Sequence, residues 1–314
     1  MRIVIFGTGG VGGYFGGRLA QAGEDVIFIA RGEHLRALRE DGLQVDSLKG
    51  DFVVRPAKAT DDPSRVGFAD VVLVGVKAWQ VSEAAQAMRP IVGPETFVVP
   101  LENGIEAPSQ LAAALGAERV LGGLCRISSF LIRPGLIRHM GIEPYVAFGE
   151  LDGRMEGRGG RLKRAFDKCV GVQAEMLPDI QAAMWSKFLF IVAVSGVGAL
   201  TRTPMGVYRS LPATRQMLED VMREVRAVAQ ARNVRLPDDV VEKTLANIDA
   251  TAPATLASMQ RDIMEGRPSE LEAQTGAVVR LGLELGVPTL VNTFIYNALL
   301  PQEKKARGEI EFPA

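Results

Sequence analysis

Hydrophobic and polar residues alternate in two different ways along this chain, and the change falls just past its middle. In the first half, short runs of apolar and β-branched residues are followed by stretches in which apolar residues recur every three or four positions. This succession of strand-like and helix-like segments is typical of a parallel sheet with helices on both faces. The predicted strands are 2–6, 25–30, 70–76 and 96–100, and the predicted helices are 11–22, 33–41 and 79–90.

Two further features describe the first half. The run Asp70–Lys77 is almost entirely apolar, as a strand buried on both faces should be, so we place it in the centre of the sheet. The stretch from about 117 to 177 has shorter strand-like runs and many glycines. We expect it to add strands and a surface helix to the same domain.

The second half contains helical periodicities only. The predicted helices are about 180–200, 208–232, 238–246, 268–286 and 289–299. We place the boundary near Leu177, because Pro178 precedes Asp179, a residue type that caps helix N-termini well. The sequence therefore predicts an α/β protein, with a doubly wound sheet domain over residues 1–177 and an all-α domain over residues 178–314.

The composition excludes several function classes. Of 314 residues, 47% are hydrophobic and 23% are charged, which is ordinary for a folded globular chain. Lys and Arg number 36 against 37 Asp and Glu, so the chain lacks the broad basic field that non-specific nucleic-acid binding needs. His34 and His139 are too few for a histidine-rich metal site or a histidine relay on their own. We predict neither nucleic acid nor metal as a ligand.

Cysteine usage and hydropathy bear on location. Cys125 and Cys169 lie far apart without CxxC spacing, so we predict two buried thiols in a cytoplasmic protein. The apolar run Phe188–Leu200 is too short to span a hydrocarbon core of about 30 Å, and no membrane segment is expected. The charged tail after Gln302 should be frayed and solvated. The apolar helices of the second half could bury either a homodimer face or an internal core.

A glycine-rich segment follows the first predicted strand and opens the first predicted helix. It consists of Gly7, Thr8, Gly9, Gly10, Val11 and Gly12, and it matches GxGxxG in the expected strand-to-helix context. In a Rossmann-type domain the first glycine allows a tight turn, the second lets the backbone approach a pyrophosphate, and the third lets helix and strand pack closely. The helix N-terminus adds oriented N–H groups for the phosphates. We predict a dinucleotide site here, with a glycine-rich turn that binds nothing as the alternative.

Two cations stand at the ends of predicted strands. At the end of the second strand, where an NAD-preferring protein would carry Asp or Glu, this chain has Arg31. A guanidinium can pair with a 2′-phosphate through charge-assisted hydrogen bonds, so NADPH is predicted over NADH, and an exposed loop residue is the alternative. Lys77 ends the strand that begins at Asp70, and it either contacts cofactor phosphate or substrate or serves at the surface.

Two polar residues hold candidate catalytic positions. Asn103 follows a predicted strand, so its amide can face a nicotinamide or a substrate carbonyl, although Asn103-Gly104 alone is a turn signal. Lys187 enters an apolar helix, where a lysine is costly unless it is paired or functional. Ile191 and Ser195 lie four and eight residues further on, on the same helix face. An ammonium there could stabilise negative charge on a carbonyl oxygen and supply its proton.

Five ordered motifs, spread over nearly the whole chain, give it a family resemblance. They are Gly7-x-Gly9-x-x-Gly12 with Arg31, Val76-Lys77-Ala78-Trp79-Gln80, Glu102-Asn103-Gly104, Trp185-Ser186-Lys187, and Ser258 followed by Gly266-Arg267-Pro268-Ser269-Glu270. In these motifs and their spacing the chain resembles the ketopantoate reductases (2-dehydropantoate 2-reductases). The resemblance implies a Rossmann domain followed by a helical domain, and NADPH-dependent reduction of 2-dehydropantoate to (R)-pantoate, on the route to pantothenate and coenzyme A.

The resemblance also implies roles for individual residues. It implies that Lys187 is the general acid, that Asn103 lies near the nicotinamide, and that Glu270 helps to hold substrate and lysine. It implies that Ser258 lies near the substrate carboxylate. From the residues alone, Glu270 could equally be a surface carboxylate or part of a capping box, and Ser258 an ordinary helix or loop hydroxyl.

The chain departs from the family pattern at the expected substrate positions. The family usually carries asparagines four and eight residues after the catalytic lysine, where this chain has Ile191 and Ser195. Glu272 and Thr275 stand where the family commonly has Asp and Asn. Because an apolar residue cannot satisfy a substrate hydroxyl, a related enzyme acting on a more apolar or larger 2-keto acid is an alternative prediction. There are two further alternatives: another dehydrogenase, such as one of the β-hydroxyacid group, and a dinucleotide-sensing protein without turnover.

Overall fold

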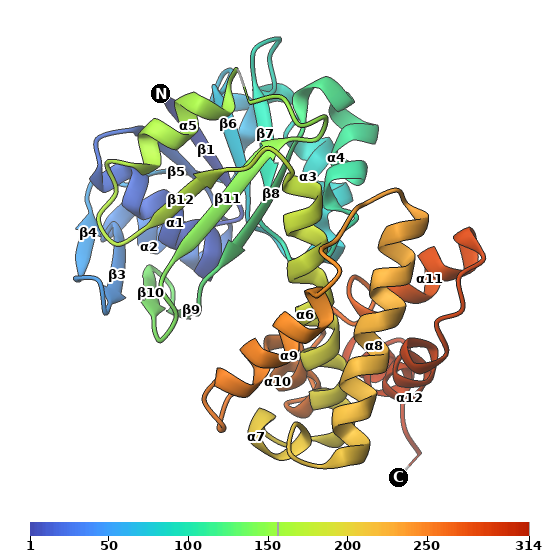
Figure 1. The fold of residues 1–314 in the computed structure, drawn as a ribbon. Helices are drawn as coiled ribbons and strands as arrows, with labels where there is room; N and C mark the ends of the chain where they lie inside the picture. The colour runs from blue at the N-terminus through green and yellow to red at the C-terminus, as the bar shows by residue number, and fades with distance from the viewer. Residues whose placement is uncertain (156, 314) are drawn as a thin grey trace. The chain divides into compact units, whose positions relative to one another are not determined.

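The computed structural model describes residues 1–155 and 157–313 and divides into two compact units. The first unit comprises Met1–Glu102 and Ala107–Ile180, and the second comprises Asn103–Glu106 and Gln181–Ala314. In Figure 1 the colours of the first unit run from blue to yellow-green, and those of the second are mostly yellow to red. The short segment Asn103–Glu106 thus follows a strand of the first unit in sequence but packs with the second.

A parallel five-stranded sheet forms the centre of the first unit, in the order β5-β2-β1-β6-β7. Its strands are β1 (Arg2–Phe6), β2 (Asp25–Ile29), β5 (Lys58–Thr60), β6 (Val71–Val74) and β7 (Phe97–Pro100). The four strands predicted from the sequence are confirmed, and β6 is buried along its whole length. The chain leaves β1 for β2 on one side and later returns to β6 on the other, so the sheet has a topological switch point beside β1.

Helices cover both faces of this sheet, as predicted. They are α1 (Gly10–Gln21), α2 (Gly32–Glu40), α3 (Val81–Ala87) and α4 (Ala107–Leu115), of which the sequence predicted the first three but not α4. Alternate residues of β1 point to opposite faces. Ile3 and Ile5 join one apolar cluster with Phe15 of α1, whereas Val4 joins another with Val81 of α3. The doubly wound architecture therefore follows from strands that are apolar on both faces.

Two smaller sheets complete the first unit. They have the strand orders β4-β3-β10-β9 and β12-β11-β8. Their strands are β3 (Leu43–Ser47), β4 (Phe52–Val54), β8 (Leu121–Arg126), β9 (Ser129–Arg133), β10 (Leu136–His139), β11 (Tyr145–Glu150) and β12 (Gln173–Met176). With α5 (Gly159–Phe166), they confirm the strands and helix expected over about 117–177, whereas β3, β4 and β5 were not predicted. Cys125 and Cys169 are free and buried, as predicted.

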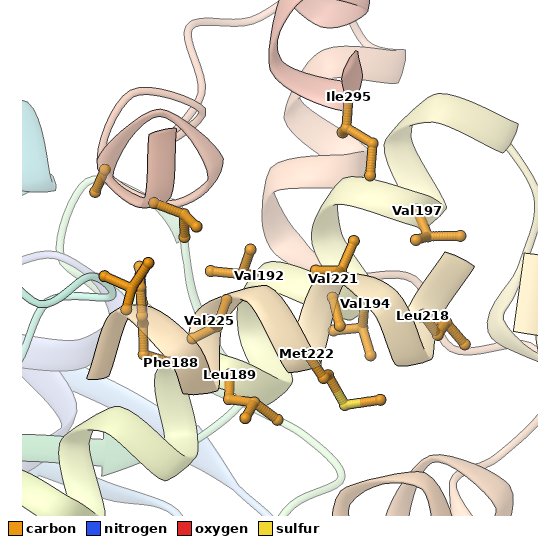
Figure 2. Packing of buried hydrophobic residues seen from close by; sticks show 14 of the residues in the cluster. Phe188, Leu189, Val192, Val194, Val197, Leu218, Val221, Met222, Val225 and Ile295 are labelled. Atoms are coloured by element: carbon orange, nitrogen blue, oxygen red, sulfur yellow. The ribbon is translucent and has the colours of Figure 1, made fainter. Parts of the chain in front are cut away.

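The described part of the second unit is helical. Its helices are α6 (Ile180–Thr201), α7 (Met205–Tyr208), α8 (Pro212–Ala231), α9 (Val240–Ala250), α10 (Ser258–Met264), α11 (Thr275–Leu285) and α12 (Leu290–Ala306). Figure 2 shows side chains of α6 and α8 packed together, among them Phe188, Val192, Val221 and Val225, with Ile295 of α12 nearby. The apolar run in α6 packs into a core that the other helices of this unit share.

The length and apolar composition of α6 would also suit a membrane span. Its 22 residues include an 18-residue window with a mean hydropathy of 1.7, and 67% of that window is buried inside the structure. A mostly buried helix of this kind is typical of the core of a soluble protein. The long helix therefore matches the prediction for about 180–200 and is accounted for by packing within its own unit.

Two expectations for the second unit were wrong. The helix predicted over 268–286 begins only at Thr275, because Ser269 makes local hydrogen bonds that compete with helix formation: its hydroxyl accepts the N–H of Leu271 at 3.2 Å. The prediction of a frayed tail after Gln302 is wrong for its first residues, because α12 continues to Ala306, whereas residues 308–313 are exposed and lie outside any helix. Glu303 is 2% exposed, accepts the backbone N–H of Ser269 at 3.1 Å and pairs with Arg307 at 2.6 Å. The Glu303 carboxylate accounts for both differences, because it bonds to Ser269 in the turn before α11 and to Arg307 at the end of α12.

Candidate active site and dinucleotide loop

The glycine-rich loop makes a sharp turn between β1 and α1. Gly7 has φ +100°, a conformation that L side chains rarely adopt, and a Cβ there would lie 2.7 Å from Val76. A Cβ on Gly12 would lie 2.2 Å from the carbonyl oxygen of Gly7. The fold itself therefore requires both glycines, Gly7 for the tight turn and Gly12 for the close packing at the start of α1.

Gly9 differs from its neighbours because nothing in the protein crowds it. A Cβ on Gly9 would have no neighbour within 4 Å, and its φ of −81° suits any residue. Gly9 precedes α1, whose first N–H groups have no partners within the helix. An open position beside unpaired helix N–H groups fits a pyrophosphate that approaches the backbone. Gly10, by contrast, is needed for packing, because its Cβ would lie 2.3 Å from the carbonyl of Ser129.

Hydrogen bonds hold the loop at Thr8 and at His34 of α2. The Thr8 hydroxyl donates to the Ile29 carbonyl at 2.9 Å. The Nε2 of His34 lies 2.7 Å from the Thr8 carbonyl, and its Nδ1 accepts the N–H of Gly135 at 3.0 Å. Because a carbonyl only accepts and a backbone N–H only donates, His34 must be neutral with its proton on Nε2. Burial lowers the pKa of His34, in agreement with that neutral form.

The two predicted phosphate-binding cations are exposed at the carboxyl edge of the sheet. Arg31 follows β2, precedes α2 and lies 3.5 Å from Glu83 of α3, with the two side chains 71% and 68% exposed. Lys77 follows β6, and its Nζ lies 5.7 Å from the centre of the Trp79 ring. Both can therefore be reached by a charged ligand from solvent.

Within the second unit, three predicted catalytic residues form one hydrogen-bonded chain. Lys187, in the second turn of α6, donates from Nζ to Oδ1 of Asn103 at 3.1 Å. The Nδ2 of Asn103 donates to Oε2 of Glu270 at 3.1 Å. Lys187 and Asn103 are half-buried and Glu270 is buried. Gly104 has φ +117°, so the predicted turn after Asn103 is also present. The arrangement fixes an ammonium next to an amide oxygen that a carboxylate orients.

A second set of contacts anchors the loop that carries Asn103. Arg280 of α11 donates to Glu106 at 2.8 Å and to Glu272 at 2.9 Å. The Tyr296 hydroxyl donates to Glu272 at 2.7 Å, and burial together with this carboxylate raises the pKa of Tyr296 to about 12. Glu272 therefore holds a structural position beside the candidate site, linking the Asn103–Glu106 segment to the last two helices through Arg280.

The predicted substrate residues are placed less closely together. Ile191 is half-buried and Ser195 is 1% exposed, one and two turns along α6 from Lys187, or about 6 and 12 Å along the helix axis. Ser258 is the exposed first residue of α10, and the hydrogen bonds that join Lys187, Asn103 and Glu270 do not include it.

Sequence reasoning missed two residues at these sites. His34 was considered only as a potential metal ligand or relay member, and its place in the first turn of α2 was the signal that could have linked it to the loop. Gln274 donates to Oε2 of Glu270 at 3.2 Å and is fully buried. No local sequence pattern distinguishes this glutamine, because residues 271–274 form a turn and not the predicted helix. Among the residues that the structure describes, no group of three or more His, Cys, Asp or Glu is placed to hold a metal ion.

A doubly wound sheet with a glycine-rich loop, followed by a helical unit with a hydrogen-bonded lysine, defines the class of nicotinamide-dependent oxidoreductases. The family model described as Ketopantoate reductase PanE/ApbA matches residues 3–153, and its C-terminal counterpart matches residues 179–303. The chain belongs to the ketopantoate reductase family.

Individual relatives agree with this assignment. A 2-dehydropantoate 2-reductase of Halobacterium salinarum is 33% identical and matches over 89% of this chain and 91% of its own. The crystal structure of a PanE/ApbA family ketopantoate reductase from Ralstonia eutropha has a TM-score of 0.88 at 32% identity, over 98% of this chain and 100% of that one. A D-mandelate dehydrogenase solved with NADH shares the fold, with a TM-score of 0.87 at 22% identity over 98% and 99% of the chains.

Proposed function

We propose that the protein reduces a 2-keto acid with NADPH, with 2-dehydropantoate as the substrate and (R)-pantoate as the product. The observation that carries this proposal is the hydrogen-bonded chain from Lys187 through Asn103 to Glu270. It provides one cation, held by an oriented amide, where a 2-keto acid reductase needs a proton donor. The cytoplasmic location predicted from the cysteines is part of the same proposal, and buried thiols suit a reducing compartment.

The proposed chemistry divides between cofactor and protein. When bound, NADPH would supply the hydride that adds to the keto carbon. The ammonium of Lys187 would stabilise the negative charge that develops on the carbonyl oxygen and then donate its proton to that oxygen. Asn103 holds the ammonium through its amide oxygen, and Glu270 fixes which way that amide faces. The product is the 2-hydroxy acid with oxidised cofactor.

In the proposed cofactor site, Gly7, Thr8, Gly9, Gly10, Val11 and Gly12 form the pyrophosphate loop. The open side of Gly9 and the free N–H groups at the start of α1 fit this role. Arg31 would pair with the 2′-phosphate and Lys77 would contact a second phosphate or the substrate, since both cations are accessible.

Substitution of Lys187 tests the catalytic proposal. Lys187→Ala should lower kcat by at least about a hundredfold while NADPH still binds, because a general acid contributes roughly 10²–10⁴-fold. Lys187→Arg should retain part of the charge stabilisation but not the proton donation. Lys243→Ala, at an exposed lysine of α9, is the matched control and should leave kcat unchanged. Equal kcat for Lys187→Ala and the wild type would reject Lys187 as the acid.

Substitution of Arg31 tests the cofactor proposal. Arg31→Ala should weaken NADPH binding by about tenfold or more and leave NADH binding unchanged, because only NADPH carries the 2′-phosphate. The control is Arg36→Ala, at an exposed arginine of α2, the helix that follows Arg31; Arg36 pairs with Glu33. Fluorescence titration gives both dissociation constants. If the NADPH-to-NADH ratio does not move, Arg31 is not the phosphate ligand.

A second candidate function is favoured by one residue. Ile191 presents an apolar side chain one turn after Lys187, where a substrate hydroxyl would find no hydrogen-bond partner. Reduction of a branched 2-keto acid without that hydroxyl is therefore the alternative. Comparing kcat/KM for 2-dehydropantoate and 3,3-dimethyl-2-oxobutanoate distinguishes the two, and Ile191→Asn should move the preference toward 2-dehydropantoate by about tenfold.

A further inference from the structure

Gln274 lies directly before α11 and faces the Lys187–Asn103–Glu270 chain. Its side chain is 0% exposed, and its Nε2 donates to Oε2 of Glu270 at 3.2 Å. The amide of Asn103 donates to the same oxygen at 3.1 Å. One carboxylate oxygen therefore accepts hydrogen bonds from two side-chain amides that come from segments 171 residues apart.

The two amides at Glu270 bear on the orientation of Asn103. A carboxylate oxygen that is ionised can only accept, so both amides must present their NH2 groups to it. The oxygen of Asn103 then faces away from Glu270 and accepts the ammonium of Lys187 at 3.1 Å. The bond from Gln274 to the same oxygen restricts rotation of the Glu270 carboxyl group, which orients the Asn103 amide.

The other end of the Gln274 amide is costly for the fold. Its Oε1 is buried and has no hydrogen-bond partner among the residues that the structure describes. A buried acceptor without a donor lowers stability, and an apolar residue of the same size would avoid that loss. Stability alone therefore does not account for a glutamine at this position, whereas its bond to Glu270 does.

We infer that Gln274 is a positioning residue that holds Lys187 in place through Glu270 and Asn103. This inference rests on the proposed function only in giving Lys187 the role of proton donor. The hydrogen bonds that link Gln274, Glu270, Asn103 and Lys187 do not depend on that role, and their effect on Lys187 can be measured without turnover.

The test replaces Gln274 by Met, which removes both polar atoms of the amide and keeps the length of the side chain. Gln274→Met should lower kcat by about tenfold, change KM by less than about threefold, and leave the thermal midpoint unchanged or higher. A merely structural residue would give the opposite pattern, with a lower thermal midpoint and an unchanged kcat. That pattern would overturn the inference.

A matched control exists in the same unit. Asn292 of α12 is also 0% exposed, donates to Oε2 of Glu224 at 2.7 Å and has an unpartnered buried oxygen. In the part of the chain that the structure describes, the Asn292 side chain bonds to Val221 and Glu224 and not to Lys187, Asn103 or Glu270, so Asn292→Leu should change stability without changing kcat.

A second measurement does not depend on catalysis. Reductive methylation followed by mass spectrometry reports how readily the Lys187 ammonium is reached and released from its partner. The rate at Lys187 should rise about threefold or more in Gln274→Met and stay unchanged in Asn292→Leu. If the methionine variant does not fold, Gln274→Leu also removes both polar atoms of the amide and should give the same rise. An unchanged rate in a folded variant would overturn the inference, whereas absence of turnover in the wild type would reject only the proposed function.

Discussion

His34 shows how two hydrogen bonds can fix the charge of a single residue. It lies between the Thr8 carbonyl and the Gly135 N–H, and only the neutral ring with its proton on Nε2 satisfies both. A proton added to Nδ1 would face the N–H of Gly135. The glycine-rich loop is therefore held by a residue that titrates near physiological pH in an unfolded chain.

This arrangement predicts a pH-dependent contribution to stability. The pKa of His34 is lowered from 6.5 by burial, so the unfolded chain takes up a proton at a higher pH than the folded protein does. The free energy of unfolding should fall as the pH decreases below about 6.5. In His34→Gln this fall should be smaller. Urea unfolding of both proteins at pH 7.5 and pH 5.5 measures the difference, and an identical fall in both would contradict the prediction.

Residue patterns located much of the candidate site but not its organisation. Lys187, Asn103 and Glu270 could be predicted because they lie in motifs that resemble a known family, and the structure joins them by hydrogen bonds. Gln274 could not, because a glutamine before an apolar helix is ordinary in sequence. Its hydrogen bond to Glu270 forms because residues 271–274 make a turn where the sequence predicts the start of a helix.

At the scale of elements, the first strand and helix were predictable because their apolar periods are strong and the glycines separate them. The short strands β3, β4 and β5 were not, since three to five residues carry little periodicity. The start of α11 was missed because Ser269 bonds to Glu303, which lies 34 residues further along the chain. No local sequence pattern indicates such a contact. Distant pairing, more than propensity, decided these boundaries.

The loop between β1 and α1 allows fold and binding to be separated by two single substitutions. Gly9→Ala places its Cβ in open space at an ordinary φ, so the free energy of unfolding should change by less than about 1 kcal/mol. NADPH affinity should nevertheless fall by about tenfold or more, because the methyl group occupies the side from which a pyrophosphate would approach.

Gly12→Ala is the contrasting variant. Its Cβ would lie 2.2 Å from the carbonyl oxygen of Gly7, so overpacking should destabilise the first unit by about 1–3 kcal/mol. Urea unfolding and NADPH titration of both variants check the pair. Unchanged NADPH affinity in Gly9→Ala would mean that the loop does not contact the pyrophosphate.

At the scale of the whole molecule, the chain has two units with separate apolar cores. A ligand that binds only the folded protein raises its stability by about 2.7 kcal/mol at a hundredfold excess over Kd. NADPH at that excess should therefore raise the thermal midpoint by several degrees, and NADH at the same concentration should raise it less. Scanning calorimetry measures both. Equal shifts would argue against the proposed preference for NADPH. The homodimer stays a prediction, which light scattering tests.

The short segment Asn103–Glu106 has a practical consequence for recombination between relatives. It packs with the helical unit although 74 residues of the first unit follow it in sequence. A chimera made with one crossover near Leu177 would combine the Asn103 of one parent with the Lys187 and Glu270 of the other. An exchange that keeps each active-site network intact needs three crossovers, so that 103–106 and 181–314 come from the same parent.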